Sequence, residues 1–500
     1  MSRTGGALAG AGVDRAEDEL VRERPKMPSH SPYLSAAAMR ELIDVGSVSA
    51  QELVQQALDR IATCDTDTNA VVALRGEAAL AEAKAADALA PTQRRALHGV
   101  PVLIKDLTET TDLPTTYGSR ALRDNVATEE ALVVTRLRDA GAIIVGKTNT
   151  PETGLRPTTE NLLFGTTRNP WNPDFSPGGS SGGAAAALAM GMVPIAQATD
   201  AAGSGRIPAS CCGVVGFKPT RGLIPLAPAS YELMAGMGTI SPMARSVEDT
   251  ATLLDAMSGA IPGDPYGIGR VGSYREAASR EPKACRIGVC VTPGHGALSD
   301  EVHSIVTYAT GAFADLGNTV VDADINFGGL FDPVFTICAA TAAAIVDSAV
   351  PDERKGLLEG STIALARRGW LKTAADYVAA VSTIRAQSAR LLTEMASYDY
   401  VVTPTLTQPP PRIDAFPSGE DLDTRWRDYL DWMAFVYPLN CTGQPGVSVP
   451  AGLTASGLPV GLQIIGRPGD DGGVLALAAT YAHARPWTDQ VPDRAISTDG

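Results

Sequence analysis

The amino-acid sequence contains one long uncharged stretch, from Phe175 to Thr199, which strongly limits where this part of the chain can lie. It opens with the run Ser176-Pro-Gly-Gly-Ser-Ser-Gly-Gly183 and continues into alanine-rich sequence. Its length and lack of charge suit a membrane span, but its five glycines, two prolines, several hydroxyl side chains and one glutamine do not. We therefore expect a tight loop and a helix, both buried inside a globular protein, and no association with a membrane.

Short apolar runs alternate with helical patterns along the chain, which is typical of a protein that layers helices on a β-sheet. Strands are predicted at residues 100–104, 142–145, 400–403, 446–450 and 460–465. Helices are predicted at residues 36–45, 50–63, 129–140, 302–316, 374–396 and 473–483. Because strand candidates lie near both ends of the chain, we expect one mixed sheet that draws on both.

We expect one folded unit from residue 31 to residue 490, since neither a fixed repeat nor a long linker divides it. Within it, residues 273–396 contain helical segments without a glycine-rich loop, and we predict a helical cap there. Residues 1–30 are rich in Gly, Ala and charge and lack the apolar core of a signal peptide, so we predict a flexible tail and no export. Residues 491–500 are predicted to form a second flexible tail.

Charge and cysteine content argue against several classes of protein. The net charge of −15 is unfavourable for a nucleic-acid-binding protein, whose affinity depends on cationic contacts to phosphate. The seven cysteines form no C-x-x-C pair and the five histidines show no metal-ligand spacing, so we expect neither a metal nor a cofactor. Scattered cysteines, odd in number, are typical of reduced thiols in a cytoplasmic protein.

The residues of the glycine-rich segment suggest two kinds of site. A phosphate-binding Walker loop needs a lysine directly after its last glycine, and none follows here. The run from Gly178 to Gly182 also fits the G-x-S-x-G nucleophile elbow of α/β-hydrolases, with His295, His303 or His483 completing the triad. That pattern is short and degenerate, and nothing around the three histidines marks one of them as catalytic.

Lys105 suggests a third kind of site. It ends the apolar segment Gly99-Val-Pro-Val-Leu-Ile-Lys105, so burial there would favour the neutral amine and make it a usable base. The alternative is a lysine whose ammonium group reaches water at the end of a strand, as most such lysines do.

These residues belong to a set of ordered motifs that resembles the amidase signature family, the Ser-cisSer-Lys hydrolases. The resemblance extends from about Pro101 to Trp487, and the spacings among Lys105, Ser180 and Ser204 match those of the family. The matching motifs are Gly99-Val-Pro-Val-Leu-Ile-Lys105-Asp, Pro114-Thr-Thr-Tyr-Gly-Ser119, Gly146-Lys-Thr-Asn-Thr-Pro-Glu152, Thr167-Arg-Asn-Pro-Trp-Asn172, Ser176-Pro-Gly-Gly-Ser180-Ser-Gly-Gly183, Gly213-Val-Val-Gly-Phe-Lys-Pro-Thr220 and Gly443-Gln-Pro-Gly446. The resemblance implies an α/β fold in which a central mixed β-sheet is covered by helices on both faces, with a helical cap region.

The resemblance also implies a role for each residue of a catalytic triad. Ser204 corresponds to the nucleophile, Ser180 to the serine that follows a cis peptide bond and relays a proton, and Lys105 to the neutral base. A serine hydroxyl becomes an effective nucleophile when a base takes its proton, and the same relay then protonates the leaving amine.

The loop before Ser204 departs from the commoner pattern of the family. The resemblance places the oxyanion hole at the backbone N–H groups of Ala201, Ala202 and Gly203, together with that of Ser204. Ala202 stands where most members have glycine, so a methyl group enters the wall beside the attacked carbonyl. This variant resembles the subgroup that includes 6-aminohexanoate cyclic dimer hydrolase, which favours unusual or synthetic amides as substrates.

The same resemblance also predicts which residues lie near the substrate and which brace the nucleophile. The residues that correspond to positions near the substrate are Thr153, Gly154, Leu155 and Cys338. Leu155 would make that wall apolar, whereas for Cys338 the alternative is a buried, unreactive thiol. Asp200 and Arg206 lie on either side of the nucleophile and are expected to form a structural ion pair, with direct substrate contact as the alternative.

We therefore expect an amidase that hydrolyses the amide bonds of small or linear, largely apolar substrates through an acyl-enzyme. Carbamates, as in a urethanase, and activated esters are expected as secondary substrates, because the acyl-transfer chemistry is the same. The alternative is the A subunit of the glutamine-dependent tRNA amidotransferase, which uses the same triad and needs a partner chain. A noncatalytic binding module is a third hypothesis. The expected partner is a small-molecule amide, and the protein is expected to be a monomer or a homodimer.

Overall fold

The computed structural model describes residues 31–228, 230–413, 415 and 422–496 of the chain. The predicted tail at 1–30 lies outside these residues. The strands of the main sheet are β1 (Val71–Leu74), β2 (Pro101–Lys105), β3 (Ile143–Thr148), β6 (Ile195–Asp200), β7 (Val215–Lys218), β8 (Thr239–Ala244), β9 (Arg286–Val289), β10 (Thr319–Asp322), β11 (Tyr400–Pro404), β12 (Gly446–Leu453) and β13 (Pro459–Ile465). They form one eleven-stranded sheet in the order β1-β3-β2-β6-β8-β7-β12-β13-β11-β9-β10. Strands β4 (Glu160–Asn161) and β5 (Gly165–Thr166) form a separate pair.

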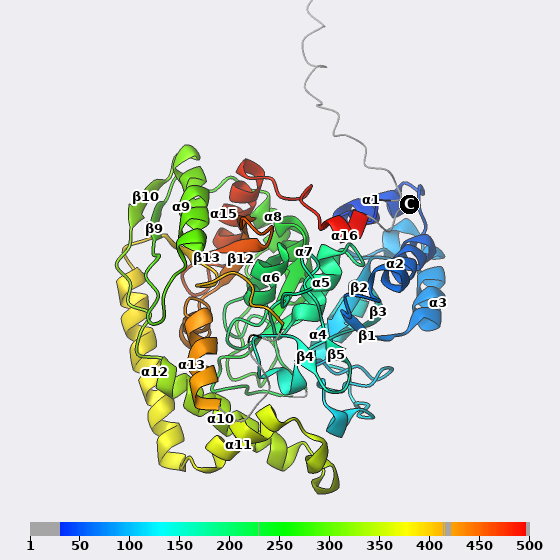
Figure 1. Cartoon of the computed structure of the whole chain (residues 1–500). Helices are drawn as coiled ribbons and strands as arrows, with labels where there is room; N and C mark the ends of the chain where they lie inside the picture. Colours follow the sequence, from blue (N-terminus) through cyan, green and yellow to red (C-terminus); the bar gives the residue numbers. More distant parts are fainter. Residues whose placement is uncertain (1–30, 229, 414, 416–421, 497–500) are drawn as a thin grey trace, which may run out of the picture.

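The helices flank this sheet (Figure 1). Their bounds are α1 (Ala36–Asp44), α2 (Ala50–Cys64), α3 (Gly76–Asp87), α4 (Leu132–Asp139), α5 (Gly182–Ala189), α6 (Arg206–Cys212), α7 (Val247–Met257), α8 (Tyr274–Ala278), α9 (Asp300–Asp315), α10 (Phe331–Ser348), α11 (Gly360–Trp370), α12 (Ala374–Met395), α13 (Leu422–Trp432), α14 (Tyr437–Thr442), α15 (Asp471–Ala484) and α16 (Asp493–Ile496). Every helix and strand predicted from the sequence is present, with boundaries that differ by a few residues.

The sheet is mixed, as predicted, and it joins both ends of the chain. Strand β2 lies parallel to β3 and to β6, whereas β12 and β13 are antiparallel and connect this half to β11, β9 and β10. Every residue of β2, β3 and β13 is buried, which explains why their sequences are mostly apolar. Helices α4, α7, α15 and α9 follow one another along one face, while α5 and α6 pack together against the sheet.

The uncharged stretch folds as predicted into a loop and a buried helix, followed by β6. All eight residues of α5 are buried, and their small side chains allow close packing against the sheet and against α6. Gly179, in the loop, lies directly against the backbone of Thr158, because a Cβ atom there would be 2.6 Å from the Thr158 carbonyl oxygen. The glycines therefore allow the loop to approach neighbouring backbone more closely than side chains would permit.

The predicted helical cap at 273–396 is wrong in its first half. Residues 286–289 and 319–322 form β9 and β10, and α9 between them packs on β11, β12 and β13. These two short strands, of which β10 forms the edge of the sheet, are only partly buried, so their sequences carry little of the apolar signal expected of a strand. The helical region proper consists of α10, α11 and α12, which gather with α13 at one end of the molecule (Figure 1, lower left).

The C-terminal tail predicted at 491–500 is also corrected where the structure describes it. Residues Asp493–Ile496 form α16, Ala495 is fully buried, and its carbonyl oxygen accepts a hydrogen bond from Arg60 on α2. Packing against the N-terminal helices therefore orders this segment. Residues 497–500 lie outside the described part of the chain.

Helix α10 is long and apolar enough to cross a membrane by length and composition alone. A core helix passes the same test, and α10 packs against α11 and α12 and contributes to the second of two apolar clusters in the protein. That cluster lies among α6, α10, α12, α13 and α14, beside the sheet cluster, and it surrounds the site described next.

Candidate active site

Lys105 lies at the end of β2 with its side chain fully buried. Three hydroxyl oxygens surround its Nζ atom: Ser180 Oγ at 2.7 Å, Ser181 Oγ at 2.8 Å and Thr199 Oγ1 at 2.9 Å. Strand β6, which runs parallel to β2, supplies Thr199, and the loop that leads into α5 supplies the two serines. The parallel pairing of β2 and β6 thus brings the lysine beside hydroxyl groups that lie far away in the sequence.

Burial lowers the pKa of Lys105 well below its ordinary value of 10.5, and the negative charge of Asp200 only partly opposes this shift. A fully buried ammonium group without a carboxylate in direct contact is disfavoured relative to the neutral amine. The neutral amine has a lone pair and can therefore accept a proton.

The two serines beside Lys105 have different surroundings. The peptide bond between Gly179 and Ser180 is cis, as the resemblance implied. The Ser181 hydroxyl donates its proton in a hydrogen bond to the carbonyl oxygen of Thr199 at 3.2 Å, so this proton is not directed at Lys105. Ser180 Oγ has no partner other than Lys105 among the hydrogen bonds of the described residues. Ser180 is therefore the hydroxyl that can exchange a proton with the lysine.

The turn that carries Ser204 is built around a buried ion pair, as predicted. Arg206 Nε lies 2.9 Å from Asp200 Oδ2, and both side chains are fully buried. Burial alone would raise the pKa of Asp200, but the Arg206 guanidinium and the Asn440 amide outweigh it and lower that pKa to about 2. Asp200 therefore keeps its charge and braces the turn.

The same carboxylate changes the predicted oxyanion hole. The Gly203 N–H donates to Asp200 Oδ1 at 2.8 Å, and Gly203 does not line the pocket beside Ser204. Its φ of +112° is one that glycine adopts most readily, and a Cβ atom there would lie 2.5 Å from Val436 Cγ2. Gly203 is thus corrected from oxyanion donor to structural residue, because its N–H is occupied.

The other N–H groups predicted to form the oxyanion hole are available to a substrate. Within the part of the chain that the structure describes, no acceptor takes the backbone N–H of Ala201, Ala202 or Ser204. These three residues line the same small pocket. A carbonyl oxygen in the pocket could therefore receive hydrogen bonds from the turn that carries Ser204.

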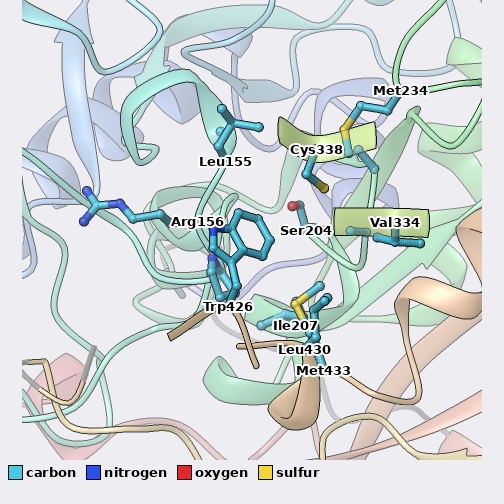
Figure 2. Close-up of a pocket in the computed structure, with 14 residues that line it drawn as sticks. Leu155, Arg156, Ser204, Ile207, Met234, Val334, Cys338, Trp426, Leu430 and Met433 are labelled. Carbon is cyan, nitrogen blue, oxygen red and sulfur yellow. The ribbon is translucent and has the colours of Figure 1, made fainter. Parts of the chain in front are cut away.

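The walls of this pocket are almost entirely apolar (Figure 2). Leu155, Met234 and Cys338 lie above Ser204 in this view, Val334 lies to its right, Trp426 to its lower left, and Leu430 and Met433 below it. The remaining lining residues are Gly154, Arg156, Pro157, Ala201, Ala202 and Ile207. The charged residue in this wall, Arg156, has its guanidinium bound to Glu359 at 2.9 Å, so its charge is not available to a substrate.

Three of the four residues expected near the substrate lie in the pocket wall. Gly154, Leu155 and Cys338 line it, whereas Thr153 does not. The Thr153 N–H donates to the Tyr117 carbonyl at 2.7 Å, and its hydroxyl donates to the backbone beside it. Burial raises the pKa of the Cys338 thiol to about 12, which keeps this group neutral.

The histidines of the alternative elbow do not reach the site. His295 contacts Asp431 and Tyr437, and His483 lies 3.1 Å from Glu248 with an exposed ring. His303 is exposed on α9. None of them lines the pocket or is hydrogen-bonded to Ser180, whose partner is Lys105.

Sequence reasoning missed several residues of the site. Ser181 and Thr199 complete the environment of the Lys105 amine, and Trp426 and Met433 close the pocket from a distant segment. Ser181 was visible as the second serine of the pair. For the other residues, only tertiary packing brings them to the site. Among the residues that the structure describes, no group of three or more His, Cys, Asp or Glu could hold a metal ion.

Comparison with known proteins agrees with this architecture. The family model described as Amidase matches residues 52–475. An acylamidase from Rhodococcus erythropolis is 36% identical over 474 residues, which cover 92% of this chain and 97% of that protein. The A subunit of a glutamyl-tRNA(Gln) amidotransferase from Nitratidesulfovibrio vulgaris is 36% identical over 479 residues, covering 91% and 97% of the two chains.

The solved structure of 6-aminohexanoate cyclic dimer hydrolase complexed with substrate matches with a TM-score of 0.87. It is 32% identical and covers 93% of this chain and 100% of that one. The mixed sheet with flanking helices is thus the architecture of amide-hydrolysing enzymes of this type. The chain belongs to the amidase signature family. It is an amidase, a hydrolase of amide bonds.

Proposed function

We propose that the protein hydrolyses small, largely apolar amides through an acyl-enzyme on Ser204, with Ser180 as proton relay and Lys105 as base. The observation that carries this proposal is the 2.7 Å contact between the buried Lys105 amine and Ser180 Oγ. A neutral amine has two N–H donors and one lone pair. Ser181 and Thr199 accept the two N–H groups, which leaves the lone pair for the Ser180 hydroxyl.

The reaction then follows from these positions. Ser204 Oγ attacks the amide carbon and forms a C–O bond, while its proton passes through Ser180 to Lys105. The negative carbonyl oxygen receives hydrogen bonds from the turn, for which Ala201 and Ala202 have open N–H groups. The C–N bond breaks as the same proton returns through Ser180 to the leaving amine, and water later releases the acid and restores Ser204.

The pocket supports apolar substrates. Its walls of aliphatic, sulfur-containing and indole side chains would bind an acyl chain or ring by removing apolar surface from water. A carbamate presents the same carbonyl to Ser204, so we also propose carbamates and activated esters as secondary substrates. The acylamidase and cyclic dimer hydrolase among the similar proteins are consistent with this proposal.

The alternative is a glutamine-hydrolysing component of a larger complex, which the similarity to the A subunit of the tRNA amidotransferase favours. Free glutamine carries an α-amino and an α-carboxylate group, and binding both would require charged partners. Among the described residues that line the pocket, only Arg156 is charged, and it is paired with Glu359 and Glu160. The pocket therefore fits glutamine poorly.

One assay separates the two functions. Purified protein alone is incubated with anilides whose acyl groups range from acetyl to octanoyl, with matched carbamates, and with glutamine. Release of aniline without a partner chain is the expected result. Release of ammonia from glutamine, dependent on an added partner, together with inertness toward every anilide, would overturn the proposal.

A further inference from the structure

The pocket wall formed by Gly154 and Leu155 lies between two charged side chains, Glu152 and Arg156. Both are buried, with 2% and 8% of their surface exposed, and both extend to the beginning of α11. Together with Glu359 and Thr362 at that end of α11, they form a buried polar cluster, which we call the clamp. Buried charges of this kind persist only where they are paired and hydrogen-bonded.

Glu152 holds the first side of the clamp. Its Oε1 accepts from the Ser119 hydroxyl at 2.7 Å. Its Oε2 accepts from the Glu359 backbone N–H at 2.8 Å and from the Thr362 hydroxyl at 2.6 Å. Glu152, which lies just before the wall residues Gly154 and Leu155, is therefore bound directly to the first turn of α11.

Arg156 holds the second side. Its Nη2 donates to Glu359 Oε2 at 2.9 Å, while its Nη1 lies 3.4 Å from Glu160 Oε1. The other oxygen of Glu359 accepts from the Leu162 N–H at 2.8 Å. Arg156, which directly follows Leu155, is therefore bound to the same end of α11 as Glu152.

Helix α11 in turn fixes the opposite wall. A Cβ atom at Gly369 would lie 2.0 Å from the Ala339 carbonyl oxygen, so α11 contacts the backbone of α10 directly at this point. Ala339 follows Cys338, which lines the pocket together with Val334 one helical turn earlier. The clamp and this close helix contact thus connect the two facing walls through one helix, α11.

We propose that the clamp sets the separation between the Leu155 wall and the α10 wall and so selects the width of the apolar group beside Ser204. This inference rests on the proposed function, in that the pocket accommodates the apolar part of an amide. The clamp residues are positioning residues, because their hydrogen bonds and ion pairs join the loop to α11 and do not involve Lys105 or Ser180. If the Leu155 wall and the α10 wall are held at a fixed separation, the pocket between them excludes branched groups more strongly than linear groups of equal size.

Two isomeric anilides test this idea by separating width from apolar area. Hexananilide and 2,2-dimethylbutananilide have the same number of carbon atoms, so the ratio of their dissociation constants reports on shape more than on buried area. Binding is measured by calorimetry in a Ser204→Ala background, which removes turnover. We expect the parent to bind the linear isomer more tightly.

The variants are Glu359→Gln, Thr362→Val and Thr362→Ser. We expect the first two to reduce the linear-to-branched preference by about fivefold, the scale on which pockets discriminate small apolar differences. Thr362→Ser keeps a hydroxyl for Glu152 and should retain the parent's ratio. Glu353→Gln, on an exposed carboxylate close to α11, is the matched control and should also retain it. Thermal melting of each variant confirms that it is folded before its ratio is compared.

An unchanged ratio in both Glu359→Gln and Thr362→Val would overturn the inference. An equal change in Glu353→Gln or Thr362→Ser, or no binding of either anilide to the parent, would overturn it as well. Failure of the proposed function gives a different result, because the protein with Ser204 intact would then release no aniline while the binding ratios could still shift.

Discussion

The Gly203 N–H donates to Asp200 Oδ1 at 2.8 Å, so the residue directly before Ser204 is held by the same carboxylate that binds Arg206. Asp200 Oδ2 also lies 3.2 Å from the Gly205 nitrogen, directly after Ser204. One buried carboxylate thereby fixes the backbone on both sides of the proposed nucleophile. The backbone conformation of the turn around Ser204 therefore depends on the ion pair between Asp200 and Arg206.

We expect Asp200→Asn to destabilise the protein by about 3–5 kcal/mol, because it leaves the Arg206 charge buried without a counterion. The free energy of unfolding in urea measures this loss. Asp174→Asn is the control, since Asp174 pairs with Arg412 at 3.5 Å on the surface and should contribute less than about 1 kcal/mol. Equal losses in the two variants would contradict a special role for the buried pair.

The second prediction concerns the nucleophile. Ser204→Ala should abolish covalent labelling by a fluorophosphonate and reduce amide hydrolysis by at least about 10⁴-fold, because the proposed relay through Ser180 then has no nucleophile to activate. Single replacement of His295, His303 or His483 by alanine should leave substantial activity. If labelling persists in Ser204→Ala and disappears in Ser180→Ala, the elbow interpretation of Ser180 is correct instead.

The third prediction concerns pH. Protonated Lys105 has no lone pair, so activity should be low below its pKa, rise with pH through it and stay level above it. Because burial lowers that pKa, the rise should occur well below 10.5. Lys105→Met should reduce kcat by roughly 10²- to 10⁴-fold at neutral pH. Lys84→Ala, at an exposed lysine on α3, is the control; near wild-type turnover in Lys105→Met would exclude Lys105 as the base.

The fourth prediction concerns Ala202, whose methyl group lies in the pocket wall. Ala202→Gly widens the space beside the attacked carbonyl and makes the turn more flexible, since glycine has more backbone states. We expect the ratio of kcat/KM values for linear and bulky acyl groups to change more than the overall rate. A common factor for every substrate would show that Ala202 does not govern selectivity.

The sequence predicted the sheet, and the proximity of Lys105 and Ser180, better than it predicted the surroundings of these two residues. Long periodic segments such as α12, and strands such as β2 in which four apolar residues precede Lys105, can be recognised from their own residues. The short, partly exposed β9 and β10 cannot, because β9 pairs with β11, which is distant in sequence, and β10 joins the sheet through β9. The occupied N–H of Gly203 depends on the orientation of one carboxylate, and no spacing in the sequence encodes that.

The pocket walls show the same limit. Trp426 and Met433 reach Ser204 only because α13 packs against α10, and Thr199 reaches Lys105 only because β2 and β6 are neighbours. Composition and periodicity describe each segment by itself. Contacts between such segments follow from the complete fold.

The order of strands separates the reacting groups from the walls around them. Lys105, Ser180 and Ser204 come from β2, β6 and the loops beside them, whereas one part of the pocket lining comes from α10 and α13, which follow β10 and β11 in the chain. Substitutions in these two helices can therefore diversify the range of substrates over evolutionary time while the reacting groups keep their places. Exchange of the segment from β9 to α13 between relatives would therefore replace the part of the wall that α10 and α13 form, while Leu155, Ala202 and the reacting groups stay in place.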